Sequence, residues 1–169
     1  YGELPKGYDH KYVYSHLGYN LKVTDMQAAV GVAQLKKIPD FVERRRHNFT
    51  YMLNKLQDVA DKFILPEPCK NSRPSWFGFL LTCREGINRE KVVRYLEEHG
   101  IQTRMLFAGN LIKHPCFDQM RASGKGYRVV GKLENTDRIM RDTFWIGVYP
   151  GMTDEKLDYM ANIIKEAII

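Results

Sequence analysis

Residues 76–82 read Trp-Phe-Gly-Phe-Leu-Leu-Thr, a short, unbroken run of mostly aromatic and aliphatic side chains. Prolines at positions 66, 68 and 74 precede the run and prevent a helix from continuing into it. A short apolar run that is rich in aromatic residues and follows such a break is typical of a buried β-strand. The sequence therefore predicts a buried strand here, around which the other elements can be placed.

Two further strands are predicted downstream, with helices between the strands. A helix is expected after Asn88, whose side chain can cap it, and Gly100 lies where that helix would end. Residues 101–104, Ile-Gln-Thr-Arg, predict the second strand, and residues 143–149, Thr-Phe-Trp-Ile-Gly-Val-Tyr, predict the third.

The segment from Leu106 to Asn135 shows neither helical nor alternating periodicity, and irregular chain of this length is usually kept for function. A short helix is expected from Asn135, and a final amphipathic helix is expected with Thr153 or Asp154 as its cap. Short strands separated by helices, without strict βαβ spacing, predict a small α/β (α+β) sandwich with a mostly antiparallel sheet packed against helices.

The amino-terminal part divides into an arm and a helix. Residues 1–23 are rich in tyrosine but have no pattern that could bury itself, so we expect an arm that needs another surface. Thr24 and Gln27 have the spacing of a capping box, which begins a helix of small apolar side chains. This helix fits either a buried core helix or a contact with another domain or subunit. A second helix is expected from Pro39, and residues 24–169 are expected to form one domain.

The composition predicts a folded chain, with 44% hydrophobic and 12% aromatic residues. Because the chain opens with Tyr1 and not Met, we expect a fragment of a longer protein. Its apolar stretches are far shorter than the roughly 20 residues that cross a bilayer, so no membrane insertion is expected. The cysteines at positions 69, 83 and 116 form no CxxC pair, which fits a reducing cytoplasm.

The formal charge of +6 raises the possibility of nucleic-acid binding. The basic runs Lys36–Lys37 and Arg44–Arg46 lie on helical patterns, however, which favours a solvated or interface face over a nucleic-acid groove. Attraction of an anionic small substrate is another use of this charge. The histidines lack metal-binding spacing, and Gly124–Gly126 lacks the rest of a phosphate loop. No metal site and no nucleic-acid partner are therefore expected.

Residues 12–35, YVYSHLGYNLKVTDMQAAVGVAQL, combine a Gly-Tyr-Asn element with a T-D-x-Q-A-A helix. This stretch resembles the DegT/DnrJ/EryC1/StrS family of sugar aminotransferases and dehydratases, which is built on the aspartate-aminotransferase fold. The resemblance continues through SWFGFLLT, GIQTRMLFAGNL and NTDRIMRDTFWIGVYPGMT. FAGN and TFWIG-YPG look most like the branch of CDP-4-keto-6-deoxyglucose 3-dehydrases of lipopolysaccharide O-antigen synthesis. The resemblance implies that residues 24–169 are the carboxyl-terminal small domain of a fold type I enzyme, without its large cofactor domain.

The resemblance also implies binding roles for individual residues. Asn20 of the Gly-Tyr-Asn element is expected to reach the cofactor phosphate from the partner subunit, because its amide can donate to a phosphate oxygen. Lys22 stands where the family often has Arg and can pair with the phosphate as a point charge. The substrate-binding candidates are Tyr19, Arg104, Phe107, Asn110 and Arg138. Structural alternatives stay open for these residues: a turn or cap for the asparagine at position 20, packing for the tyrosine and ion pairs for the arginines.

The implied reaction uses pyridoxamine or pyridoxal phosphate as an electron sink while the 3-hydroxyl of a CDP-4-keto sugar is lost. In this branch a histidine replaces the Schiff-base lysine, and a cysteine-ligated 2Fe-2S cluster passes electrons from a reductase. Both features lie upstream of Tyr1 in the family pattern, so we expect no catalytic residue, no cluster and no activity in the chain alone. The whole enzyme is expected to be a homodimer. The alternatives are an aminotransferase of the same family and a noncatalytic dimerisation module.

Overall fold

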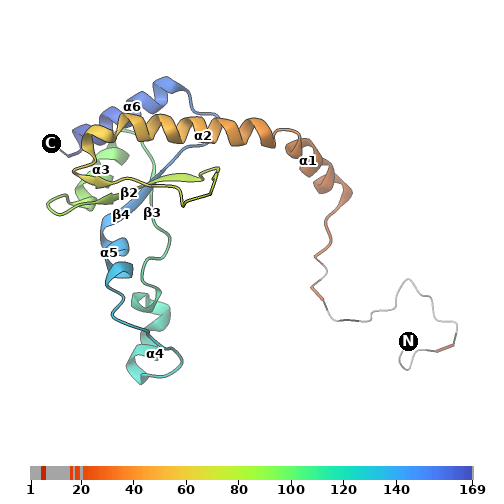
Figure 1. The fold of residues 1–169 in the computed structure, drawn as a ribbon. Helices are drawn as coiled ribbons and strands as arrows, with labels where there is room; N and C mark the ends of the chain where they lie inside the picture. The colour runs from red at the N-terminus through yellow and green to blue at the C-terminus, as the bar shows by residue number, and fades with distance from the viewer. Residues whose placement is uncertain (1–4, 7–15, 17, 20, 169) are drawn as a thin grey trace. The chain divides into compact units, whose positions relative to one another are not determined.

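The structure, a computed structural model, describes residues 5–6, 16, 18–19 and 21–168. The chain divides into two units, Tyr1–Ile38 and Pro39–Ile169. The first unit contains helix α1 (Asp25–Leu35), and the second contains the sheet and its helices (Figure 1). Asn20 lies outside the described residues, so its predicted role stays a prediction.

The helices of the larger unit, with α2 beginning one residue before it, are α2 (Ile38–Lys55), η2 (Gln57–Val59), α3 (Arg89–Glu98), η3 (Leu111–Lys113), η4 (Pro115–Phe117), α4 (Asp118–Ser123), α5 (Glu134–Asp142) and α6 (Asp154–Glu166). Its strands are β1 (Phe63–Ile64), β2 (Gly78–Cys83), β3 (Thr103–Met105) and β4 (Thr143–Gly147). The three predicted strands correspond to β2, β3 and β4, whereas the two-residue β1 was not predicted because it is too short to show a pattern.

The strands form one four-stranded sheet in the order β1-β2-β4-β3. Every pair of neighbours is antiparallel, which confirms the predicted antiparallel sheet. In the register of β2 and β4, Phe79 lies opposite Ile146 and Leu81 lies opposite Phe144. Strand β3 pairs on one side with β4 and is therefore an edge strand.

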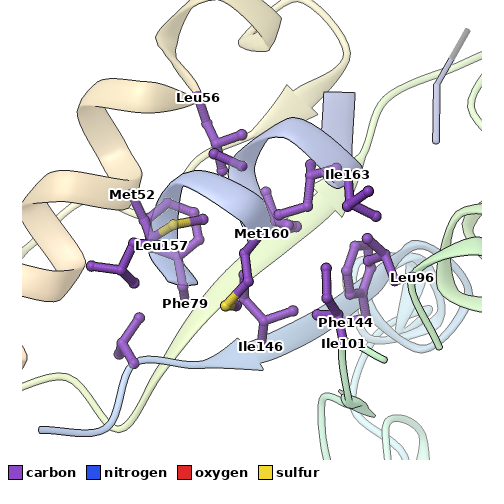
Figure 2. Packing of buried hydrophobic residues seen from close by; sticks show 14 of the residues in the cluster. Met52, Leu56, Phe79, Leu96, Ile101, Phe144, Ile146, Leu157, Met160 and Ile163 are labelled. Carbon is purple, nitrogen blue, oxygen red and sulfur yellow. The ribbon is translucent and has the colours of Figure 1, made fainter. Parts of the chain in front are cut away.

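One face of the sheet carries the hydrophobic core. Alternate side chains of a strand point to opposite faces, and Phe79, Leu81, Phe144 and Ile146 are all fully buried on the same face. Residues of α2, α3 and α6 pack against them, as Figure 2 shows for Met52, Leu56, Leu96, Leu157, Met160 and Ile163. Figure 1 shows α2 and α6 on this side of the sheet and α5 on the other. The opposite face is therefore covered less completely and can present side chains to a ligand or a partner.

The predicted caps of α3 and α6 are present. The Asn88 side chain accepts a hydrogen bond from the backbone N–H of Lys91 at 3.1 Å. Gly100 follows α3 with φ +75°, a left-handed conformation that glycine adopts without steric cost. Of the two candidates for the α6 cap, Thr153 has this role, and its hydroxyl accepts from the backbone N–H of Lys156 at 3.4 Å.

The segment after β3 is more ordered than the sequence suggested. The turns η3 and η4 and the short helix α4 lie within residues 106–135, where irregular chain was expected. These elements were missed because each is six residues or shorter, which is too short for helical periodicity to be recognised. Helix α5 begins at Glu134, one residue before the expected start.

Helix α1 begins with the predicted capping box. The Thr24 hydroxyl accepts from the Gln27 backbone N–H at 3.4 Å, and the Gln27 side chain accepts from the Thr24 backbone N–H at 3.0 Å. No residue of α1 is buried by the described chain, and the Met26 side chain is 81% exposed. The described part of its own unit does not bury α1, and its interpretation as a buried core helix stays a prediction. Its role as a contact with another domain or subunit stays a prediction.

Candidate functional site

The exposed face of the sheet is organised around Trp145. The indole Nε1–H donates to the backbone carbonyl of Met105 at 3.1 Å, which holds the ring across the end of β3. The Phe77 ring lies beside it, with 5.1 Å between the ring centroids and a tilt of 55°. Phe77 itself is 67% exposed. Two large aromatic side chains are thus available on the face that the core does not use.

Gly78 allows the indole of Trp145 to lie directly on strand β2. A Cβ atom at position 78 would be 2.5 Å from Cε3 of Trp145 and 3.1 Å from the carbonyl oxygen of Ile146. Side chains do not approach a Cβ atom that closely, so any other residue would displace the ring. A glycine inside a strand often marks such a close approach. A glycine inside the aromatic run at residues 76–82 therefore indicates the aromatic contact at this site, which was not among the predictions from the sequence.

Arg104 lies on β3 directly opposite Trp145 in the antiparallel register, so both side chains belong to the exposed face. One guanidinium nitrogen, Nη1, donates to the backbone carbonyl of Thr103 at 2.7 Å. The side chain borders a cavity of about 380 Å³ between β3, the end of β4 and α6. Arg104 therefore combines exposure, positive charge and an adjacent cavity, as a substrate-binding cation requires.

Phe107 follows β3 and is 79% exposed. Its φ of +46° lies in the left-handed region, which is strained for a bulky side chain. Strain of this kind clusters at ligand-binding and catalytic sites, because the surrounding structure has to hold it in place. The conformation is consistent with the predicted role of Phe107 without testing it.

Asn110 is 2% exposed, and its amide is directed into the protein. The Nδ2 atom donates to Oδ1 of Asp137 at 2.7 Å, and Nζ of Lys113 lies 2.8 Å from the same oxygen. The Asn110 amide, followed by the Lys113 ammonium, lowers the pKa of the Asp137 carboxyl below its usual value. Asn110 thus fastens the segment after β3 to α5.

Arg138 lies on α5 and lines a second cavity of about 840 Å³. Three other arginines line this cavity, and each is occupied by the fold: Arg84 donates to Ala60, Arg89 donates to Arg141, and Arg141 pairs with Asp142. Acidic side chains are also part of the lining. The structure therefore places Arg104 and Arg138 at different cavities. Of these two cavities, the one beside Arg104 has no described Asp or Glu in its lining.

The described residues of the smaller unit include two candidates. Tyr19 is 92% exposed, and Lys22 is also exposed. Their predicted binding roles stay predictions. The Lys22 ammonium can meet a phosphate group without first leaving a buried position.

The cysteines differ in their environment, and all three are free thiols. Cys83 is buried at the end of β2, and this burial raises the pKa of its thiol to about 11. Cys69 and Cys116 are exposed. Within the described ranges, no three His, Cys, Asp or Glu side chains are placed to hold a metal ion. No helix among those ranges has the length and apolarity needed to cross a membrane.

Sequence comparison relates the chain to proteins that make bacterial sugars. It is 56% identical over 167 residues to the lipopolysaccharide biosynthesis protein RfbH of Salmonella typhimurium, covering 98% of this chain and 37% of the relative. It is 45% identical over 169 residues to dTDP-4-dehydro-2,6-dideoxy-D-glucose 3-dehydratase of Saccharopolyspora spinosa, covering 99% of this chain and 35% of the relative. The chain thus spans little more than a third of the length of these relatives.

Solved structures give the same relationship at the level of the fold. A GDP-4-keto-6-deoxymannose-3-dehydratase with a trapped PLP-glutamate geminal diamine superposes with a TM-score of 0.79 and 25% identity, over 94% of this chain and 40% of that one. DesV of S. venezuelae, in complex with a ketimine intermediate, superposes with a TM-score of 0.77 at 20% identity, over 92% of this chain and 39% of that one, which supports the fold alone. Residues 3–165 match the sequence pattern of one family. The chain belongs to the DegT/DnrJ/EryC1/StrS aminotransferase family.

Proposed function

We propose that this chain is the small, carboxyl-terminal domain of a sugar 3-dehydratase that acts on a nucleotide-linked 4-keto sugar with pyridoxamine or pyridoxal phosphate. The observation that carries the proposal is the identity of 45% to a 3-dehydratase over 99% of the chain. The 56% identity to a lipopolysaccharide biosynthesis protein supports a role in lipopolysaccharide synthesis. Within that role, the substrate we propose is CDP-4-keto-6-deoxyglucose, for formation of the 3,6-dideoxyhexoses of O-antigen. The domain division proposed is an arm at 1–23 and the small domain at 24–169.

The overall reaction replaces the C-3 hydroxyl of the sugar by hydrogen. The hydroxyl leaves as water, with one proton from solvent. An electron pair from a reductase and a second proton form the new C–H bond at C-3. When bound, the pyridoxamine phosphate supplies the electron sink for this loss. The proposal assigns the histidine at the Schiff-base position and a 2Fe-2S cluster to the part of the relatives' length that this chain does not span. The whole enzyme proposed is a cytoplasmic homodimer, and the isolated 169-residue chain is proposed to be inactive.

The cofactor residues proposed within this chain are Asn20 and Lys22. Exposure of the Lys22 ammonium fits a phosphate ligand, because a phosphate dianion is recognised by exposed donors and positive charge. Their task is to bind and orient the phosphate, and no proton transfer is assigned to them.

One proposed substrate residue, Arg104, lies on the exposed face of the sheet. Arg104 can pair with the pyrophosphate group, and Trp145 is its register partner on β4. Phe107 can cover the sugar and exclude water from it, while Asn110 holds the segment that carries Phe107. Arg138 and Tyr19 are retained as further substrate-binding candidates, with less support from their surroundings.

An anaerobic absorbance spectrum of the whole protein with pyridoxamine phosphate tests the proposal. Visible iron–sulfur bands without a lysine-bound cofactor band support the 3-dehydratase. A lysine-bound cofactor band without iron supports the second candidate, an aminotransferase of the same family. The observation that favours this candidate is the family match over residues 3–165. The apolar exposed surface of α1, which includes Met26, supports a contact between subunits or domains in either case. A protein with neither spectrum would favour the noncatalytic dimerisation module.

A further inference from the structure

The basic loop, residues 124–132, follows helix α4. It reads Gly-Lys-Gly-Tyr-Arg-Val-Val-Gly-Lys, with three cations and no acidic residue. The cations, Lys125, Arg128 and Lys132, are all exposed. Nζ of Lys132 lies 4.0 Å from Glu134, whereas among the described residues no acidic side chain pairs with the other two cations. The basic loop therefore carries positive charge that the fold does not neutralise.

Two exposed valines lie between the cations of the basic loop. The Val130 side chain is 73% exposed, and that of Val129 is 39% exposed. Burial of a valine is favourable because it removes apolar surface from water, and this part of the chain leaves that surface in water. Arg128 precedes the valines, and Lys132 follows them after one glycine. Apolar side chains and positive charge are thus adjacent in the basic loop.

Two glycines bend the chain before and after the valines. Gly126 has a φ of +86° and Gly131 has a φ of +75°, and both lie in bends. This left-handed conformation is strained for residues with a Cβ atom, which explains glycine at both positions. Gly126 also lies next to α4, because a Cβ atom there would be 3.5 Å from Sδ of Met120. Figure 1 shows α4 at the end of the larger unit away from α2 and α6, so the basic loop begins at that end.

We propose that the basic loop binds the surface of an anionic phospholipid bilayer. The three cations lie against the lipid phosphates, and the two valines lie among the headgroups. Cations close to an anionic membrane are attracted by its surface potential, and apolar side chains between them add burial from water. The contact is at the surface of the bilayer, so it needs no spanning helix. It goes beyond the proposed function, because it does not depend on the reaction that the whole protein catalyses.

A lipid surface fits the basic loop better than an acidic protein or a nucleic acid does. A stable protein interface buries about 800 Å² on each partner and depends on anchors that fill pockets, which a loop of this length does not supply. Nucleic-acid phosphates attract the cations but leave the two valines in water. A bilayer takes up both kinds of side chain, and its fluid surface needs no complementary shape.

Vesicle co-sedimentation of the whole protein tests the proposal. We expect binding to vesicles of phosphatidylglycerol and phosphatidylcholine in equal amounts to be at least about tenfold tighter than binding to phosphatidylcholine alone, because only the anionic vesicles attract the cations. Added salt should weaken this binding by screening. Equal affinity for both kinds of vesicle, or no binding to the anionic ones, would overturn the proposal. No cofactor or sugar is added, so the result is independent of the proposed function.

Variants assign the binding to the basic loop. Arg128→Gln should weaken binding to the anionic vesicles by at least about fivefold, which is the contribution of one cation near such a surface. Lys70→Gln is the matched control, since it removes an exposed cation outside the basic loop, and it should retain wild-type binding. Val130→Ser should weaken binding by about fivefold because it removes apolar burial, whereas Val130→Leu should retain or strengthen binding. All three positions are exposed, so the unfolding temperature should not change.

The remaining outcomes separate the lipid surface from other partners. Equal losses in Arg128→Gln and Lys70→Gln would show attraction by net charge and overturn the assignment to the basic loop. Wild-type binding by Val130→Ser would show that the valines do not enter the headgroup region and overturn the bilayer contact. Duplex DNA that removes the protein from the vesicles at equal phosphate concentration would assign the basic loop to nucleic acid and overturn the choice of lipid.

Discussion

Two glycines that face each other across the sheet should respond in opposite ways to the same substitution. Gly78 and Gly147 are partners in the register of β2 and β4. A Cβ atom at position 78 would lie 2.5 Å from Cε3 of Trp145, whereas one at position 147 has open space around it. Overpacking of this kind costs about 1–3 kcal/mol, and displacement of the indole adds roughly 1 kcal/mol for its hydrogen bond to Met105. We expect Gly78→Ala to lower the free energy of unfolding by about 2–4 kcal/mol.

Gly147→Ala is the matched control, because it adds the same methyl group to the neighbouring strand. Its free energy of unfolding should change little or rise by up to about 1 kcal/mol, since alanine restricts the unfolded chain more than glycine does. Urea unfolding measures both, and a loss of 2 kcal/mol corresponds to a shift of roughly 1 M in the midpoint. Fluorescence in a Trp76→Phe background reports Trp145 alone and should change for Gly78→Ala. Equal midpoints for the two variants would refute the reasoning.

Four further outcomes follow from the described contacts. Asn110→Ala should lower the free energy of unfolding by about 1–3 kcal/mol, because Asn110 is buried and donates to Asp137; an unchanged urea midpoint would contradict this. NMR titration should show that the pKa of Asp137 is below its ordinary value of 3.8. The ionised Asp137 therefore stabilises the fold above pH 3.8, and this stabilisation is lost as the pH falls through the lowered pKa. The same titration of Asn110→Ala should show this pKa rising toward 3.8. Phe144→Ala, at a fully buried core position, should cost about 3–5 kcal/mol in thermal or urea unfolding. Maleimide labelling followed by mass spectrometry should modify Cys83 far more slowly than the two exposed cysteines until urea unfolds the chain, and equal native rates would contradict its burial and raised pKa.

The secondary structure was largely predictable because its signals are local. The aromatic run at 76–82, the Asn88 cap and the Thr24 capping box each depend on residues within one element, and the structure contains all three elements. Strand β1 (Phe63–Ile64) could not be found in this way, since its pairing with β2 is a tertiary contact. The burial of α1 could not be judged either, because apolar side chains pack equally well in a core or at an interface.

The candidate site depended on contacts between distant segments. The family resemblance implied that Arg104 and Asn110 both bind the substrate. In the structure Arg104 borders a cavity, whereas the amide of Asn110 is bonded to Asp137. The cavity brings together residues 100–104, 145–152 and 156–160, which no local pattern connects. Gly78 was the one local sign of the site, because a glycine inside a buried strand indicates close approach of another group.

Product analysis with the whole protein tests the central claim most directly. The protein that contains this chain would be incubated anaerobically with CDP-4-keto-6-deoxyglucose, pyridoxamine phosphate and a reductase, and the sugar product would be identified by mass spectrometry and NMR. The account predicts a CDP-linked sugar that has lost the oxygen at C-3 and carries no amino group. A product that retains this oxygen and has gained an amino group would contradict the 3-dehydratase assignment and identify an aminotransferase.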